Sequence, residues 1–407
     1  MGGGGTSDEL PTIVRVIDAR AAELSALLEQ RVLQRLGAEG GWLPFDRYMA
    51  MALYEPGLGY YARGEAIFGA WPASRNGDRN RSSAGSDFIT APELSPFFGA
   101  ALARQVAEVL RLGAIDEVIE FGAGSGALAG QLLDALAALG VPLRRYAIVE
   151  LTGALRARQQ ARLARFGAQV QWLDAWPPED NAAIDAVVVG NEVLDAMPVK
   201  LLHFDGDQWL ERGVVAAPAP ATTGAAQELA FGDRPTTLRP PRADEALPGA
   251  VVELHEQAAA FVATVAERLH RGAGFFIDYG FPEAEYYHPQ RHQGTLMCHR
   301  AHRADTDPLA DPGTKDITAH VDFTAMALAA QEAGAEVVGY TSQARFLINC
   351  GLPELLRGAK PQALSAAHKL LAEHEMGELF KVLAFARGVP FEAAPLGFSA
   401  GDRTHTL

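Results

Sequence analysis

A hydrophobic strand that runs into a glycine-rich turn and then into a helix limits the possible folds of this chain more than any other feature. The stretch reads IEFGAGSGALAG over residues 119–130, and Gly122, Gly124 and Gly126 follow Glu120 at alternate positions. Backbone N–H groups at the start of such a helix can hold the oxygens of a ligand, and glycine permits close approach and positive φ angles. The stretch therefore predicts a turn that cradles a nucleotide-like cofactor.

From residue 117 onward, apolar strands alternate with amphipathic helices. The expected strands lie at 117–121, 146–150, 170–173, 184–190, 274–280, 335–342 and 379–387. The helices expected between them lie at 125–139, 153–165, 254–271, 322–333 and within 343–375. Such alternation is typical of a parallel sheet covered by helices on both faces. We therefore predict an α/β fold with a seven-stranded, mostly parallel sheet, in which the last strand lies reversed beside the sixth.

Other segments have a composition of their own. Apolar residues at helical spacing predict a long helix over 11–36. The polar, Gly-rich and Arg-rich run 69–86 predicts a mobile surface loop. Residues 200–250 begin like a β-hairpin and continue in a Pro/Ala-rich stretch that we expect to be loose.

The expected organisation follows from these segments. It comprises a helical extension over 1–94, a main domain over 95–388 with an insertion at about 200–250, and a tail over 389–407.

Composition excludes several classes of protein. The chain carries 35 basic and 50 acidic residues, a net charge of −15, and has no basic stripe, so nucleic acid is not the expected partner. No run of about 18 apolar residues occurs, so no membrane span is expected. Two cysteines and no secretion or organelle signal lead us to expect a reducing, cytoplasmic location. No set of residues has the spacing of metal ligands, so no metal is expected.

The glycine turn alone fits two cofactors. Gly122-x-Gly124-x-x-Ala127 matches the loose dinucleotide pattern, whereas Glu120 followed by three alternate glycines matches the pattern of S-adenosylmethionine enzymes. Glu150 ends the second strand, where a carboxylate can accept hydrogen bonds from ribose hydroxyls of either cofactor. More than 110 residues precede the turn, and a reversed last strand is expected. Both features favour S-adenosylmethionine.

Seven motifs, in order, resemble one family. They are ALYEPGLGYY, DFITAPELSPFFG, EFGAGSG, GNEVLDAMPV, FFIDYG, DITAHVDFTA and MGELFKVLA. The chain resembles the MidA family of S-adenosylmethionine-dependent methyltransferases over roughly residues 40–388. The resemblance implies a class I, Rossmann-like methyltransferase fold and a protein substrate. The mitochondrial member methylates an arginine of a respiratory complex I subunit during assembly. The poly-Gly start and insertions near 70–85 and 216–250 depart from the family.

Candidate cofactor contacts follow from position and from the resemblance. Besides the glycine turn and Glu150, Asp174 follows the third strand, where an adenine amino group can be met. The resemblance places Thr90 over the cofactor, although Thr90 can equally cap a helix in a capping box with Glu93. Asn191 directly follows the buried run AVVVG at the ligand-binding edge of the sheet, so it is expected to contact cofactor or substrate.

Candidate catalytic residues are Asn191, Glu192, Asp278 and His320. If the acceptor is a guanidinium, a planar carboxylate suits its forked donors, and Glu192 is the expected partner. Asp278 or His320 would then take up the released proton. Two alternatives stay open: an NAD(P)-dependent oxidoreductase, and a non-catalytic, cofactor-binding assembly factor. The sequence does not determine the acceptor, the number of methyl groups added or the oligomeric state.

Overall fold

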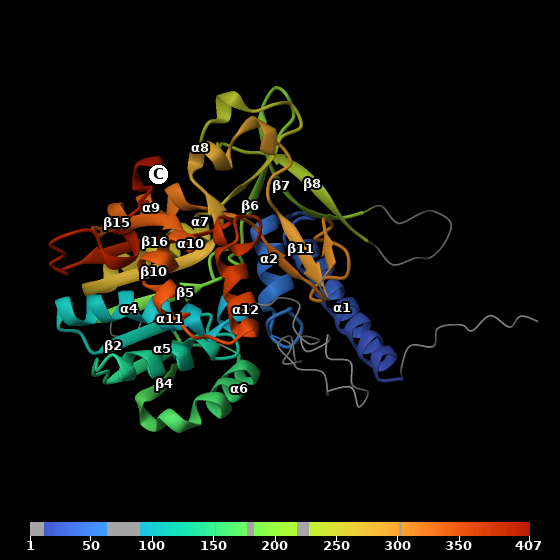
Figure 1. The fold of residues 1–407 in the computed structure, drawn as a ribbon. Helices are drawn as coiled ribbons and strands as arrows, with labels where there is room; N and C mark the ends of the chain where they lie inside the picture. The colour runs from blue at the N-terminus through green and yellow to red at the C-terminus, as the bar shows by residue number, and fades with distance from the viewer. Residues whose placement is uncertain (1–11, 63–89, 151, 177–182, 218–227, 301–302) are drawn as a thin grey trace, which may run out of the picture.

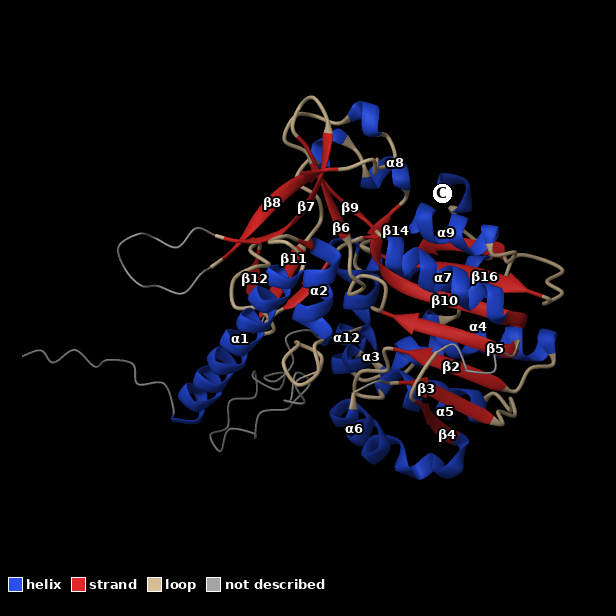
Figure 2. Ribbon diagram, turned by 180° about the vertical axis from the view of Figure 1, so that it is seen from behind, coloured by secondary structure: helices blue, strands red, loops and turns tan. Residues whose placement is uncertain are grey.

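The computed structural model describes residues 12–62, 90–150, 152–176, 183–217, 228–300 and 303–407 (Figure 1). The loop expected at 69–86 lies outside these residues, as does 218–227 within the insertion. A large mixed sheet with helices on both faces forms one part of the molecule. A smaller antiparallel sheet and the N-terminal helices lie beside it (Figure 2).

The large sheet has the strand order β15-β16-β10-β5-β2-β3-β4, and the short β14 pairs with β10. Its strands are β2 (Glu117–Phe121), β3 (Arg145–Val149), β4 (Val170–Leu173), β5 (Ile184–Asn191), β10 (Leu269–Phe281), β14 (Val321–Asp322), β15 (Glu336–Ser342) and β16 (Phe380–Arg387). β16 runs antiparallel to both β10 and β15, which confirms the reversed last strand. The expected count of seven strands is wrong, because β14 is an eighth strand of this sheet. β14 has only two residues, which is too short to give a strand pattern in the sequence.

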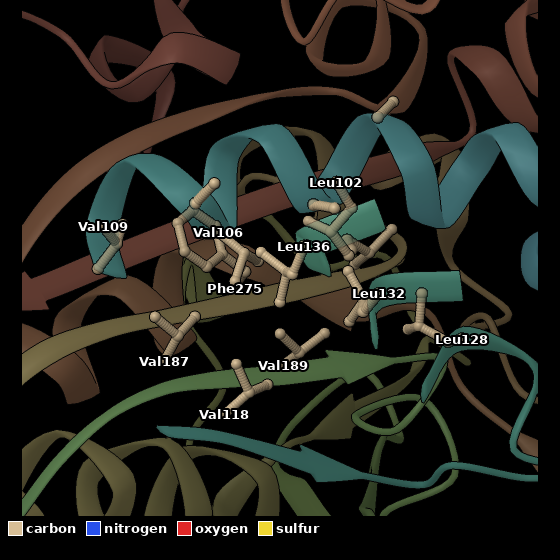
Figure 3. Close-up of a cluster of buried hydrophobic side chains, with 14 of the residues drawn as sticks. Leu102, Val106, Val109, Val118, Leu128, Leu132, Leu136, Val187, Val189 and Phe275 are labelled. Atoms are coloured by element: carbon tan, nitrogen blue, oxygen red, sulfur yellow. The ribbon is translucent and has the colours of Figure 1, made fainter. Parts of the chain in front are cut away.

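Helices cover both faces of this sheet. One face carries α4 (Pro96–Gly113), α5 (Ala127–Ala138), α6 (Gly153–Leu163), α10 (Gln343–Asn349), α11 (Leu352–Leu355) and α12 (Pro361–Leu371). The other carries α7 (Glu256–Arg268) and α9 (Phe323–Glu332). Figure 3 shows part of the first core, formed by Leu102, Val106, Val109, Val118, Leu128, Leu132, Leu136, Val187, Val189 and Phe275. This double-sided packing explains why the parallel strands read as continuous apolar runs.

The smaller sheet is antiparallel, with the order β1-β7-β6-β9 and with β8 on β7. It comprises β1 (Leu43–Pro44), β6 (Lys200–Phe204), β7 (Trp209–Ala216), β8 (Leu229–Pro235) and β9 (Val251–Leu254). The expected hairpin is confirmed as β6 and β7. The prediction that the following segment is loose is wrong for 232–235, because these residues belong to β8, which pairs with residues 210–216 of β7 although it carries Gly232 and Pro235.

The N-terminal helices α1 (Thr12–Ala38) and α2 (Phe45–Tyr54) pack on this smaller sheet. A third sheet contains β11 (Met297–Arg300), β12 (Arg303–Asp305) and β13 (Asp316–Thr318). Two further short helices are α3 (Ala91–Leu94) and α8 (Glu283–Tyr286). No helix among the described residues is long and apolar enough to span a membrane. The residues after β16 also pack, since Phe398 is buried against Phe346.

Candidate functional site

A cavity of about 340 Å³ lies where β2, β3 and β5 end. Open α/β sheets bind ligands at this edge, because the turns after neighbouring strands meet there. The cavity is also lined by residues that follow α2 and by residues of β13, which lie outside the large sheet. It therefore has one wall from the large sheet and one from the neighbouring part of the molecule.

The glycine turn forms the floor of the sheet side. Gly122, Gly124 and Gly126 have φ angles of 64°, 51° and 80°, which other residues rarely adopt. A Cβ on Gly122 would lie 2.7 Å from Val193 Cγ2, whereas one on Gly124 would have no neighbour closer than 4.0 Å. Gly124 thus leaves bare backbone next to open space, whereas Gly126, an expected cofactor contact, does not line the cavity and is the N-cap residue of α5.

Glu120 lines the cavity from β2, although only 2% of it is exposed. Its Oε2 accepts a hydrogen bond from the Tyr146 hydroxyl at 2.7 Å. Burial raises the pKa of Glu120 to about 7, and the Tyr146 hydrogen bond opposes that shift. A buried carboxyl of this kind favours a cationic ligand group, because a cation would stabilise its ionised form.

Glu150 follows β3 and is held by three donors. Its Oε1 accepts from the backbone N–H and the hydroxyl of Thr152, at 2.9 and 2.6 Å. Its Oε2 accepts from Gln159 Nε2 at 2.9 Å, and the same nitrogen donates to the carbonyl of Gly124 at 3.0 Å. Gln159 in turn accepts from the Trp172 indole. The network fixes the carboxylate at the cavity wall next to the glycine turn.

Asn191 and Glu192 line the cavity after β5. Asn191 Nδ2 donates to Glu192 Oε1 at 2.9 Å, and Glu192 has a φ of 54°. Burial and, second, the nearby Asp195 raise the pKa of Glu192 to about 7, against hydrogen bonds from Asn191 and the Ala91 backbone that lower it. Asn191 is 7% exposed, and its buried Oδ1 has no hydrogen-bond partner among the described residues. Both side chains are therefore available to a ligand.

Asp278 does not line the cavity. Its Oδ2 accepts from the backbone N–H groups of Val193, Leu194 and Asp195 at 3.1, 2.9 and 3.3 Å. Burial and the neighbouring carboxylates raise its pKa. The geometry thus makes Asp278 the anchor of the loop that carries Glu192, and gives no support to its expected role as proton acceptor.

Two other expected site residues also lie away from the cavity lining. The His320 ring packs edge-on against Tyr279, with centroids 5.1 Å apart, and burial lowers its pKa to about 4. Asp174 is 86% exposed and forms an ion pair with Arg156 at 2.6 Å. Their predicted roles stay predictions without support from the geometry, because the chain turns both side chains toward other partners.

Thr90 lines the cavity and directly precedes α3. Its hydroxyl makes no capping hydrogen bond, so the capping box with Glu93 does not form. Glu93 instead accepts from Ser125, which lies within the glycine turn, and from Arg162. Ser95 is the real N-cap of the next helix, where its hydroxyl accepts from the Phe97 N–H at 3.3 Å. Thr90 therefore lines the cavity without a capping role, in a position where a ligand can meet it.

Several lining residues were missed by the sequence reasoning. Tyr54, Tyr61, Asp195, Tyr279 and Asp316 share one wall of the cavity. Asp195 belongs to the quoted motif GNEVLDAMPV, and Tyr279, which follows Asp278, belongs to the motif FFIDYG. Two of the family motifs quoted above, ALYEPGLGYY and DITAHVDFTA, contain the other three, so a signal was present. Among the described residues, no group of three or more His, Cys, Asp or Glu is arranged to hold a metal ion.

The residues present fit S-adenosylmethionine. A bare glycine backbone, a buried carboxyl and a fixed carboxylate at the end of the second strand suit its methionine and ribose parts. A family model of S-adenosyl-L-methionine-dependent methyltransferases matches residues 101–341. The chain belongs to this family. As a methyltransferase of this family it uses S-adenosylmethionine as its cofactor, which confirms the expected family and cofactor.

Solved structures agree with this assignment. A COG1565 superfamily member from Burkholderia thailandensis bound to S-adenosyl-homocysteine is 48% identical, with a TM-score of 0.86. It covers 98% of this methyltransferase and 100% of its own chain. A second uncharacterized COG1565 superfamily protein from that organism is 46% identical, with a TM-score of 0.82 and the same coverage. No finding supports an NAD(P)-dependent oxidoreductase.

More distant relatives carry a more specific name. The Caenorhabditis elegans protein named protein arginine methyltransferase NDUFAF7 homolog, mitochondrial, is 25% identical over 411 residues. That match covers 89% of this methyltransferase and 88% of the relative. The Drosophila melanogaster protein of the same name is 27% identical over 388 residues, covering 86% and 82%.

Proposed function

We propose that this methyltransferase methylates an arginine side chain of a protein partner. The observation that carries the proposal is Glu192, a planar carboxylate on the wall of the cofactor cavity, held by Asn191 and surrounded by other acidic groups. The names of the distant relatives agree with it. We infer that the partner is a subunit of a respiratory complex, as the family resemblance implies.

The side chains can do the necessary work. The cofactor supplies an electrophilic methyl group on a sulfonium. A guanidinium, with a pKa above about 12, stays charged and presents a rigid fork of N–H donors to a carboxylate. Glu192 can accept these donors and so orient the acceptor nitrogen, while Asn191 fixes the Glu192 carboxylate through Oε1. A docked cation favours the ionised form and so lowers the pKa of Glu192 from its value of about 7.

The test is the substitution Glu192→Gln, which keeps the shape and removes the charge. Methyl transfer should fall by about 100-fold or more, since removing one partner of a buried charge pair costs about 3–5 kcal/mol. Affinity for S-adenosyl-homocysteine should barely change, because the expected cofactor contacts lie mainly on β2 and β3. A radiolabelled methyl assay on lysate proteins, followed by identification of the labelled residue, measures both the rate and the acceptor.

Glu332→Gln is the matched control, because Glu332 is exposed at the end of α9. It should transfer methyl groups at the wild-type rate. Label on any residue other than arginine, or equal rates for wild type and Glu192→Gln, would refute the guanidinium proposal.

A further inference from the structure

Two buried aspartates line the cavity, and each is held by a tyrosine hydroxyl. Asp195 Oδ2 accepts from Tyr279 at 2.5 Å, and Asp316 Oδ2 accepts from Tyr61 at 2.8 Å. Asp195 is 5% exposed and Asp316 is 6% exposed, and both line the cavity. These acids come from different segments, since Asp195 follows β5 and Asp316 begins β13.

Aromatic rings lie directly beside the aspartates. The Tyr54 and Tyr61 rings stack with centroids 5.6 Å apart and an interplanar angle of 21°. The Tyr54 hydroxyl donates to the Ala196 carbonyl at 2.8 Å, which ties the ring to the loop after β5. Burial raises the pKa of Tyr54, and Asp316 and Asp195 contribute in the same direction, so both carboxylates lie close enough to act on this ring. Tyrosine faces attract planar cations.

The charge of the cavity is one-sided. Its lining includes six carboxyl groups, Glu93, Glu120, Glu150, Glu192, Asp195 and Asp316, of which Glu93 is paired with Arg162 outside the lining. Not one of the described residues that line it is Lys, Arg or His. Buried charge without a partner is costly, so such a cavity favours ligands that bring positive charge. The cofactor brings some, but Asp195 and Asp316 lie outside the segment of residues 117–163 that carries the glycine turn and Glu150.

Asp195 shows directly that charge is uncompensated there. Burial raises its pKa to about 6, against a hydrogen bond from Tyr279 and backbone hydrogen bonds that lower it. No side chain among the described residues donates to its buried Oδ1. Asn191 Oδ1, on the same loop, is likewise buried and unpaired in the described structure. Both unpaired acceptor atoms thus belong to residues that line the cavity.

We propose that Asp195 and Asp316, together with the stacked rings of Tyr54 and Tyr61, form a second acidic subsite that binds the guanidinium of the acceptor arginine. This inference rests on the proposed function and extends it beyond Glu192. The two aspartates accept hydrogen bonds from the guanidinium N–H groups that Glu192 does not bind. The tyrosine rings favour a planar cation over a compact ammonium. The subsite also places the N-terminal segment in the substrate-binding machinery, because Tyr54 and Tyr61 lie outside the large sheet.

The probe for this subsite is N-acetyl-arginine amide, titrated calorimetrically into the full chain saturated with S-adenosyl-homocysteine. The neutral analogue N-acetyl-citrulline amide should bind at least about tenfold more weakly, because a charged hydrogen bond is lost. Asp195→Asn and Asp316→Asn should each weaken arginine binding by about tenfold to a hundredfold. Neither should change the affinity for S-adenosyl-homocysteine by more than about twofold.

Matched controls separate binding from folding. Asp185→Asn removes a carboxylate at the opposite end of β5, where it pairs with Arg271, and should leave arginine binding unchanged. Tyr61→Phe removes the hydroxyl that holds Asp316 and should weaken arginine binding several-fold. Tyr286→Phe removes an equivalent hydroxyl, which donates to Glu253 away from the cavity. This variant should bind arginine as well as the wild type does.

Each outcome decides the inference. Equal binding of the arginine and citrulline probes overturns it, as does an absence of arginine binding to the wild type. Wild-type affinity for arginine in Asp195→Asn and Asp316→Asn overturns it as well. If either aspartate variant fails to bind S-adenosyl-homocysteine, the Tyr61→Phe and Tyr286→Phe pair decides. Label on lysate arginines combined with unchanged binding in the variants would refute this inference alone, whereas label on another residue type would refute the proposed function.

Discussion

The two ends of the cavity are built in different ways. The cofactor end is mostly local, because the glycine turn, Glu150 and Gln159 come from one strand–helix–strand–helix segment between residues 117 and 163. The acceptor end is assembled from distant segments, since Tyr61 bonds to Asp316 across 255 residues and Tyr279 to Asp195 across 84. One supersecondary unit is therefore enough to carry the expected cofactor contacts. The side chains of the acceptor end, in contrast, come together only when separate units pack.

The cofactor end should be the more sensitive to backbone changes. Gly124→Val would force a β-branched residue to a φ of 51° and fill the open space beside the turn. We expect the affinity for S-adenosyl-homocysteine to fall by more than about 100-fold, with an added strain of about 1–2 kcal/mol. Isothermal titration calorimetry would measure the affinity, and chemical denaturation the stability.

Gly140→Val is the control for that change. Gly140 has a φ of 65° and no atom within 4 Å of a built Cβ, but it lies outside the cavity. The Gly140→Val variant should lose about as much stability as Gly124→Val but keep the wild-type affinity for S-adenosyl-homocysteine. Equal losses of affinity in the two variants would show that backbone strain, and not the filled space beside Gly124, causes the loss. The cofactor end would then be no more sensitive to backbone changes than the rest of the fold.

A single side chain at the cofactor end should have a smaller effect. Glu150→Ala removes a buried carboxylate whose charged hydrogen bond to a ribose hydroxyl would contribute about 1.5–3 kcal/mol. Affinity for S-adenosyl-homocysteine should fall by roughly 10-fold to 150-fold, while arginine binding at the other end persists in cofactor-saturated protein. Calorimetry with each ligand in turn measures both.

Asp174→Ala tests whether Asp174, like Glu150, belongs to the cofactor end of the cavity. Asp174 was expected to meet the adenine, but it is 86% exposed and paired with Arg156. An exposed ion pair contributes little, so the affinity should stay within about twofold of wild type. A loss comparable to that of Glu150→Ala would restore Asp174 to the cofactor site.

A further expected effect at the cofactor end concerns pH. Burial holds the pKa of Glu120 near 7, above its ordinary value of 4.5. Folding therefore favours the protonated form, and this stability is present below about pH 4.5 and is lost as the pH rises through about 7. Binding of the cofactor's ammonium favours the ionised form, so S-adenosyl-homocysteine affinity should rise several-fold between about pH 6 and pH 8.

Glu120→Gln isolates this effect from the other buried acids. The amide can still accept from Tyr146, so the fold should be retained. Its cofactor affinity should be lower at pH 8 and should rise less with pH than that of the wild type. Identical pH dependence in the two proteins would show that Glu120 does not face the ammonium, and that the acceptor-end carboxylates cause the dependence.

Much of the large sheet could be predicted from the sequence. The first and third strands have the observed bounds, and the reversed last strand lies where its order implied. Short or polar strands could not be predicted. β8 carries glycine and proline and is ordered by pairing with β7, and β14 has two residues and pairs only because it lies beside β10. Pairing energy of this kind depends on a partner distant in sequence.

The candidate site divides in the same way. Sequence alone determined the glycine turn, Glu120, Glu150 and Glu192, because strand, turn and helix periods place such residues at one edge of a sheet whatever surrounds them. Tertiary structure alone decided where the remaining side chains point. It turned Asp278 toward backbone N–H groups and left His320 and Asp174 off the cavity wall. It brought Tyr61 to Asp316, because the packing of separate units, and not any local period, fixes which distant side chains share a wall.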